Sequence, residues 1–413
     1  MAQPTRSPWS SWAERLRTPL RTTFRWSAVE WADEARWLRW LTFLWLFIGL
    51  LVLLSASYAS AEATEGDGWY YCKRQLIWIA VGLLGFQTAV TLPLRYVLAI
   101  AHWGLLGTMV LMWSLLIPGL GRSANGAVRW IEIGALPIQP SELLKPFLVL
   151  QSARILGQWE RLTDRHRWFW LGSVGAVILG ILLQPNLSTA AVCGMTVWLL
   201  ALTAGLPYAY LLGTAGGGFV LGLISISLRE YQQRRIASFL NPWDDPLGIG
   251  YQLVQSLLAI GSGGWWGTGF GLSQQKLASL PIQFTDFIFS VFAEEFGFFG
   301  SLLLMGLLVC YGALGLRVAA KAQDRSLRLV AVGAVLLLVG QALVNIGVAT
   351  GVLPTTGLPF PLISYGGSSA IASLFLAGLL IRVARENSTA GVVSIDRQRS
   401  RRSSRNIHPK SLS

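Results

Sequence analysis

Apolar runs of roughly 20 residues recur along the whole chain, and this repetition limits the folds open to it. A helix of that length crosses the hydrocarbon core of a bilayer while satisfying its backbone hydrogen bonds within one segment. The sequence therefore predicts an all-α polytopic membrane protein with about ten transmembrane helices. The predicted spans are residues 40–58, 75–94, 96–117, 141–155, 169–185, 189–206, 208–228, 287–313, 329–351 and 369–383.

The placement of charge indicates how the chain is oriented. Charged residues make up 13% of the 413 residues, whereas a soluble domain carries about a quarter. Basic residues gather in 1–39 and 386–413, and cytoplasmic segments of membrane proteins carry an excess of Lys and Arg. Both termini are therefore expected in the cytoplasm, as an even number of crossings requires. The largest polar segment, 229–286, lies between spans 7 and 8. With this orientation it falls outside the cell, as do the other long polar segments, 59–74, 118–140 and 352–368.

Three regions are predicted: a basic cytoplasmic extension (1–39), a transmembrane domain (40–385), and a basic, disordered cytoplasmic tail (386–413). The net charge of +13 does not by itself indicate nucleic acid, because basic termini beside a span set topology or bind anionic lipid. The three cysteines and three histidines are scattered. Neither a nucleic-acid partner nor a His- or Cys-based metal site is expected.

Residues 121–147 form the first candidate site segment, in which Gly and Pro indicate tight turns before a helix. Ser141 is suited to cap that helix, and Glu142 favours its N-terminal dipole. Lys145 lies one turn inside an apolar helix, where a charge is expensive. Two interpretations stay open: Arg129 and Lys145 bind a phosphate, or Lys145 pairs with Glu142 three residues earlier.

Two further segments carry weaker signals. The polar turn at 184–192 is expected to be structural, with Gln184 and Asn186 satisfying backbone groups freed by Pro185. The segment 229–286 is long enough to hold its own substructure. Within it, residues 250–260 predict an amphipathic interfacial helix, and the glycines of 267–271 are interpreted as flexible turns.

Three acidic residues interrupt the apolar stretch PIQFTDFIFSVFAEEFGFFG (281–300). Asp286 closes the long outer segment at the membrane edge, where partial loss of water raises a carboxylate pKa toward that of a working base. The alternative is an N-cap of the next helix. Glu294 and Glu295 lie about two turns further and are candidate partners for buried cations such as Lys145.

The last outer loop, 351–370, is dense in Pro and Gly and ends in Gly366, Gly367 and two serines. Irregular backbone at membrane depth is tolerated only where it is buried in protein or lines a wet cavity. A polar cleft at the outer face is therefore expected.

Four motifs in fixed order resemble the SEDS family, the FtsW, RodA and SpoVE proteins of bacterial cell-wall synthesis, over residues 40–385. Within the family, the chain is more similar to the division type, FtsW, than to the elongation type, RodA. One departure is Asn186, where members commonly have Asp. The motifs are NGAVRWIEIG with QPSELLK (125–145), NPWDDPLGIGYQLVQSLLAIGSGG (241–264), TDFIFSVFAEEFGFFG (285–300) and NIGVATGVLPTTGLPFPLISYGGSS (345–369).

The resemblance implies a peptidoglycan glycosyltransferase that polymerises lipid II at the outer face of the cytoplasmic membrane, at the division septum. It implies that Asp286 is catalytic, taking the proton of the attacking sugar hydroxyl while undecaprenyl diphosphate leaves with inversion. Departure of a diphosphate needs positive charge. The candidate residues for this positive charge are Arg129, Lys145, Arg234, Arg235 and Lys276.

Further residues of the matched motifs are expected to bind substrate, and Glu294 and Glu295 to pair charges within the bundle. A divalent cation stays open, although no ligand cluster is visible. A class B penicillin-binding transpeptidase and other division proteins are the implied partners. The alternatives are a lipid II flippase, an elongation-type polymerase, or a structural platform for partner proteins. The further substrate-binding residues are Gln139, Ser141, Glu142, Thr285, Ser364, Gly366 and Gly367.

Overall fold

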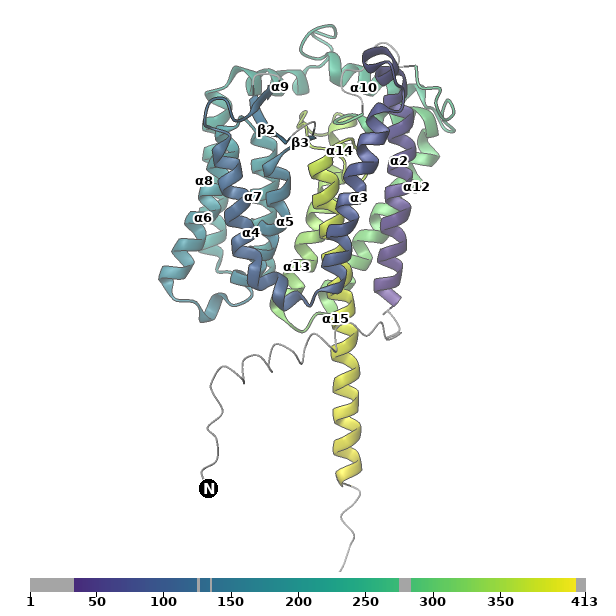
Figure 1. Ribbon diagram of the computed structural model, residues 1–413. Helices are drawn as coiled ribbons and strands as arrows, with labels where there is room; N and C mark the ends of the chain where they lie inside the picture. Colours follow the sequence, from purple (N-terminus) through teal and green to yellow (C-terminus); the bar gives the residue numbers. More distant parts are fainter. Residues whose placement is uncertain (1–32, 125–126, 134–135, 275–283, 406–413) are drawn as a thin grey trace, which may run out of the picture.

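The protein is a helical bundle with a small sheet at one end (Figure 1). The computed structural model describes residues 33–124, 127–133, 136–274 and 284–405. Both ends of the described chain lie at the end of the bundle opposite the sheet (Figure 1). The long bundle helices are α2 (Asp33–Glu65), α3 (Tyr70–Thr91), α4 (Leu94–Ser114), α5 (Pro140–Leu156), α6 (Asp164–Leu183), α7 (Leu187–Thr203), α8 (Tyr208–Ser227), α12 (Ile288–Lys321), α13 (Arg325–Val335), α14 (Gln341–Ala349) and α15 (Gly367–Arg405).

Each of the ten predicted spans overlaps a helical segment. A five-residue π-helix, Leu336–Gly340, joins α13 to α14. In the part of the chain that the structure describes, seven helical segments are long and apolar enough to cross a membrane, and α7 is a shorter apolar helix. The predicted helical membrane architecture is confirmed at this level. The helix α15 continues to Arg405, into the tail for which the sequence predicts disorder.

The expectation of an all-α chain is corrected in the segment before α5. Strands β1 (Arg122–Ala124), β2 (Ala127–Ile133) and β3 (Leu136–Ile138) form an antiparallel sheet in the order β1-β2-β3. Its register pairs Trp130 with Arg122 and Ile131 with Ile138. Pairing satisfies backbone groups that a loop lying on the bundle would leave without partners.

The long segment between α8 and α12 has its own substructure, as predicted. It holds α9 (Glu230–Leu240) and α10 (Tyr251–Ser262). Helix α10 packs on α12, because the buried Ser256 hydroxyl lies 2.5 Å from that of Ser290 and donates to the Ala349 carbonyl at 2.7 Å. The predicted amphipathic helix is therefore present and docked on the bundle.

The glycines that follow α10 pack against a break in α12. At Gly297 the backbone leaves the helical region with φ 65° and ψ −164°. The freed groups bond to the neighbouring segment: Thr268 N–H donates to the Glu294 carbonyl and Phe298 N–H to the Gly264 carbonyl, both at 2.9 Å. A Cβ on Gly267 would lie 2.1 Å from the Glu295 carbonyl oxygen. These glycines serve close backbone approach, which differs from the flexible turns that the sequence suggests.

The loop 351–366 is exposed at Val352 and Leu353, whereas most of 358–364 is buried and packs against α2. A Cβ on Gly49 would lie 2.1 Å from the Leu362 carbonyl oxygen. The Trp45 ring of α2 contacts Phe360 edge to face, with centroids 6.3 Å apart. Because both aromatic side chains are buried, the segment 358–364 is part of the core and its polar groups must be satisfied inside the protein.

Candidate functional site

Asp286 lies in the turn that precedes α12, within the electrostatic reach of Arg129 in β2. Its side chain keeps part of its surface open to solvent. The N-cap position of α12 is Phe287 and no side chain caps it, so Asp286 does not have the alternative capping role. The carboxylate is therefore available for other contacts.

Two arginines supply the positive charge around Asp286. Arg235 of α9 and Arg129 of β2 both act on its carboxylate. Arg235 Nη1 donates to the Thr355 carbonyl at 3.2 Å, and its Nη2 donates to the Tyr231 hydroxyl. A guanidinium keeps its charge at any working pH.

Arg129 is held by the turn between α6 and α7. Its Nε donates to the Gln184 carbonyl at 3.1 Å and its Nη2 to the Pro185 carbonyl. Burial lowers the pKa of Arg129, which nonetheless stays charged. Asn186 follows as the N-cap of α7, with its side-chain oxygen accepting from Thr189 N–H at 3.3 Å. The structural role predicted for this turn is confirmed, and it includes orienting Arg129.

The surroundings of Asp286 favour proton transfer. Burial raises the pKa of Asp286 above its ordinary value, while Arg235, a hydrogen bond from the Thr285 side chain, and Arg129 oppose that rise. A carboxylate whose pKa approaches the working pH is a better general base than an ordinary surface carboxylate. The same arginines are suited to a developing phosphate charge.

Lys145 is enclosed within the bundle. Its Nζ lies 2.6 Å from Glu142 Oε1, with 3% and 4% of the two side chains exposed, and donates to Gln341 Oε1 at 2.9 Å. The structure thus has the ion pair that was one of the two interpretations. A phosphate contact for Lys145 stays a prediction.

The adjacent cations of α9 have different surroundings. Arg234 is exposed and pairs with Glu230 at 2.6 Å, whereas Arg235 faces Asp286. Consecutive residues on a helix point about 100° apart, so only one of the two can face the site. Lys276, the remaining predicted cation, lies outside the described residues.

The predicted residues at the start of α5 tie it to α15. Gln139 N–H donates to Ser368 Oγ at 2.8 Å, and Gln139 Nε2 donates to Ser141 Oγ at 3.3 Å. The N-cap position is Gln139 and no side chain caps it, so Ser141 is not the cap. Both residues are placed to hold the helix end, and their contact with substrate stays a prediction.

The predicted residues of the last loop hold it beside Asp286. Ser364 Oγ donates to the Thr285 carbonyl and accepts from Phe360 N–H. Gly366 N–H donates to Gln75 Oε1 at 3.2 Å. A Cβ on Gly367 would lie 2.2 Å from the Trp78 ring. These residues thus fix the position of the Thr285–Asp286 backbone.

Glu294 and Glu295 lie at the break in α12 and are buried. Glu294 accepts from Ser273 Oγ and from Gln274 N–H at 2.8 Å. Glu295 accepts from Ser55 Oγ of α2 at 2.5 Å. Lys145, the cation suggested for them, pairs with Glu142, and their pairing with another charge stays a prediction.

Two amides of α14 belong to the site although the sequence interpretation did not include them. Asn345 Nδ2 donates to the Asp286 and Leu358 carbonyls, both at 2.9 Å, and Gln341 Nε2 donates to the Pro359 carbonyl at 2.7 Å. Polar residues four apart in an apolar span share one face and usually have partners inside the bundle. The spacing of Gln341 and Asn345 could therefore have identified them from the sequence as partners within the bundle.

The described side chains do not form a complete metal site by themselves. Within the described residues, no group of three His, Cys, Asp or Glu side chains gathers to hold a metal. The described cations near Asp286 are Arg235 and Arg129. A divalent cation shared with a substrate diphosphate stays an open alternative.

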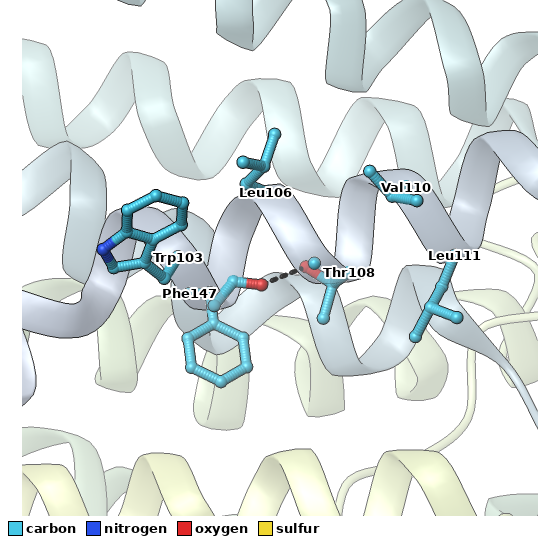
Figure 2. Close-up of a pocket in the computed structure, with 8 residues that line it drawn as sticks. Trp103, Leu106, Thr108, Val110, Leu111 and Phe147 are labelled. Carbon is cyan, nitrogen blue, oxygen red and sulfur yellow. Dashed lines mark hydrogen bonds between the residues drawn. The ribbon is translucent and has the colours of Figure 1, made fainter.

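An apolar groove of about 620 Å³ lies on α4 and α5 (Figure 2). Its lining includes Trp103, Leu106, Leu111 and Phe147. The one hydroxyl drawn, that of Thr108, donates to its own helix at Gly104. The groove offers no charged group for group transfer, so the candidate site is the cluster around Asp286.

Fold and site together define a polytopic helical membrane protein in which two arginines act on one partly buried carboxylate. The family model described as cell cycle protein, that of FtsW, RodA and SpoVE, matches residues 36–389. The chain belongs to this family, which confirms the resemblance seen in the sequence motifs.

Relatives and solved structures agree. A probable peptidoglycan glycosyltransferase FtsW of Synechocystis is 52% identical over 367 residues, covering 89% of this chain and 93% of that protein. The putative one of Mesostigma viride is 51% identical, with coverage of 89% and 88%. The RodA structure of Thermus thermophilus has a TM-score of 0.63 at 31% identity, covering 88% of this chain and 98% of that chain. A chain from a structure titled as a peptidoglycan synthase complex, described as coordinating polymerization and crosslinking, has a TM-score of 0.69 at 31% identity, with coverage of 88% and 99%.

Proposed function

We propose that the protein is a peptidoglycan glycosyltransferase that polymerises lipid II into glycan strands at the outer face of a bacterial cytoplasmic membrane. The observation that carries this proposal is Asp286, a partly buried carboxylate on which Arg235 and Arg129 both act. A base beside two fixed cations suits a reaction in which a hydroxyl attacks and a diphosphate leaves. The names of the relatives agree with this activity.

In the proposed reaction, Asp286 accepts the proton of the 4-hydroxyl of one sugar. The freed oxygen attacks the anomeric carbon of the other substrate and forms the new glycosidic bond. The bond from that carbon to the diphosphate oxygen breaks, and undecaprenyl diphosphate leaves with the electron pair, so the carbon is inverted. Arg235 and Arg129 stabilise the negative charge that develops on the diphosphate.

The proposed orientation follows from the charges of the termini. The basic residues at both ends of the chain support cytoplasmic termini. The described ends lie opposite the sheet (Figure 1), and Arg129 of that sheet acts on Asp286, so in this orientation the Asp286 site faces outward. Two cytoplasmic termini require an even number of crossings, which ten spans would satisfy.

The proposed setting is the division septum, with a class B penicillin-binding transpeptidase and other division proteins as partners. The relatives at 51% and 52% identity carry the division name FtsW, whereas the solved RodA is 31% identical. The similar chain from the peptidoglycan synthase complex supports a partner that crosslinks the product.

The test is polymerisation of labelled lipid II by the purified protein, alone and with a transpeptidase partner. We expect polymer from the wild type and none from a folded Asp286→Asn variant. Asp164→Asn is the matched control, because Asp164 is 82% exposed and pairs with Arg167 in the first turn of α6, whereas Arg129 binds the turn at the other end of that helix. Movement of lipid II across liposomes without any polymer would contradict the proposal and favour a flippase.

A further inference from the structure

Asn345 joins the two segments that make the candidate site. Its side-chain nitrogen donates to the Asp286 carbonyl and to the Leu358 carbonyl, both at 2.9 Å. An amide NH₂ carries two hydrogens, so these two bonds use both. Asn345 is 1% exposed, and its span is apolar on either side.

The two carbonyls belong to different parts of the site. Asp286 carries the carboxylate, and Leu358 follows Gly357, which faces both charged groups. An added Cβ on Gly357 would lie 3.5 Å from Asp286 Oδ2 and 3.6 Å from Arg235 Nη2. The same loop holds Arg235 through the Thr355 carbonyl at 3.2 Å. One NH₂ group therefore sets the spacing between the Asp286 backbone and the loop that positions Arg235.

The position of Asn345 on α14 is itself fixed. Gln341, one turn earlier on the same face, donates to the Pro359 carbonyl at 2.7 Å. Lys145 donates to Gln341 Oε1 at 2.9 Å, which orients the amide. The loop thus meets a rigid helix face at consecutive residues, Leu358 and Pro359.

We propose that Asn345 is a positioning residue for the transferase reaction, holding Asp286 and the Arg235 loop at their working separation. The kinetic test of this role assumes the glycosyltransferase activity proposed above. Asn345 touches no reacting atom and acts through the backbone of Asp286. A misplacement of about 1 Å at a reacting group costs on the order of 10²-fold in rate.

The charged groups that face Asp286 give the proposal a specific readout. These are Arg235, beside Tyr231 on α9, and Arg129 on β2. If the loop relaxes and Arg235 moves away, Asp286 loses a charge that lowers its pKa. The pKa of Asp286 then rises, and the acid limb of the pH–rate profile moves to higher pH.

The experiment compares Asn345→Leu and Asn345→Asp with the wild type in the full chain with its transpeptidase partner. We expect kcat to fall by about 10- to 100-fold, the KM for lipid II to stay within about twofold, and the acid limb to move upward. Asn387→Leu is the matched control, because Asn387 is an amide that donates to the Val318 carbonyl at 2.9 Å, near the end of α12 that lies away from Asp286. It should leave the acid limb in place.

A second readout does not depend on turnover. Carbodiimides modify protonated carboxyl groups, so the pH midpoint of Asp286 labelling, measured by mass spectrometry, follows its protonation. We expect that midpoint to rise in Asn345→Leu and to stay unchanged in Asn387→Leu. An unchanged midpoint in folded Asn345 variants would overturn the inference even if the wild type made no polymer. Polymer from a wild type whose Asn345 variants have normal kcat would overturn the inference alone and leave the proposed function standing.

Discussion

Asp286 and Arg235 meet at Gly357. A Cβ on that glycine would lie 3.5 Å from Asp286 Oδ2 and 3.6 Å from Arg235 Nη2. Gly357 has a φ of 69°, a conformation that side chains disfavour. The carboxylate from before α12, the cation from α9 and the glycine from the last loop thus form one small cluster from three distant parts of the chain.

Arg235→Gln should reduce polymerisation by roughly 10²-fold, the usual effect of removing one preorganised group that stabilises developing charge. Because Arg235 lowers the pKa of Asp286, its loss should also move the acid limb of the pH–rate profile upward. Initial rates of lipid II polymerisation across pH check both effects.

Arg234→Gln is the comparison for that variant. Arg234 and Glu230 are 60% and 76% exposed, and such surface pairs contribute at most about 1 kcal/mol. We expect a much smaller loss of rate than for Arg235→Gln. A larger loss at Arg234 would contradict the choice of Arg235 over Arg234 among the cations named from the sequence.

Asp286→Asn should raise the melting temperature at neutral pH while abolishing polymerisation. Burial raises the pKa of Asp286 in the folded protein, so the folded state binds more protons than the unfolded state over that interval. The contribution to stability therefore falls as pH rises from the unfolded pKa through the folded pKa, and the ionised group destabilises the fold at neutral pH. Thermal unfolding in detergent at neutral and acidic pH measures this, and the gain should shrink in acid. A lower melting temperature at neutral pH would contradict the prediction.

Lys145→Met should destabilise the protein by about 3–5 kcal/mol, because Glu142 would remain as an uncompensated buried charge. Adding Glu142→Gln should recover much of that loss, and thermal unfolding of the three variants provides the comparison. If Lys145→Met instead kept its stability and lost polymerisation, a direct phosphate contact would be the better account.

Gly267→Ala should destabilise the break in α12. Gly267 has a φ of 83°, and its Cβ would overlap the Glu295 carbonyl oxygen at 2.1 Å. Backbone strain of this kind costs about 1–3 kcal/mol before the overlap is relieved. Gly261→Ala in α10 is the control, because a Cβ there meets nothing within 4 Å. Equal thermal stability of the two variants would argue against tight packing at the break.

The positions of the helices could be predicted because hydropathy over about 20 residues is a property of one segment. Asp286 could be predicted as a candidate because its place at the edge of a span follows from the same pattern. The turn at Asn186 was also predictable, since capping acts within three residues.

The sequence by itself determined that this chain is a helical membrane protein and that Asp286 directly precedes a span. Only the tertiary structure decided which groups surround that carboxylate. Arg235 was separated from Arg234 by helix rotation, and Asn345 gained its role from a loop 13 residues later in the chain and a turn 59 residues earlier. The physical reason is range: hydropathy and capping act along the chain, whereas pairing of charges and amides depends on which segments the bundle brings together.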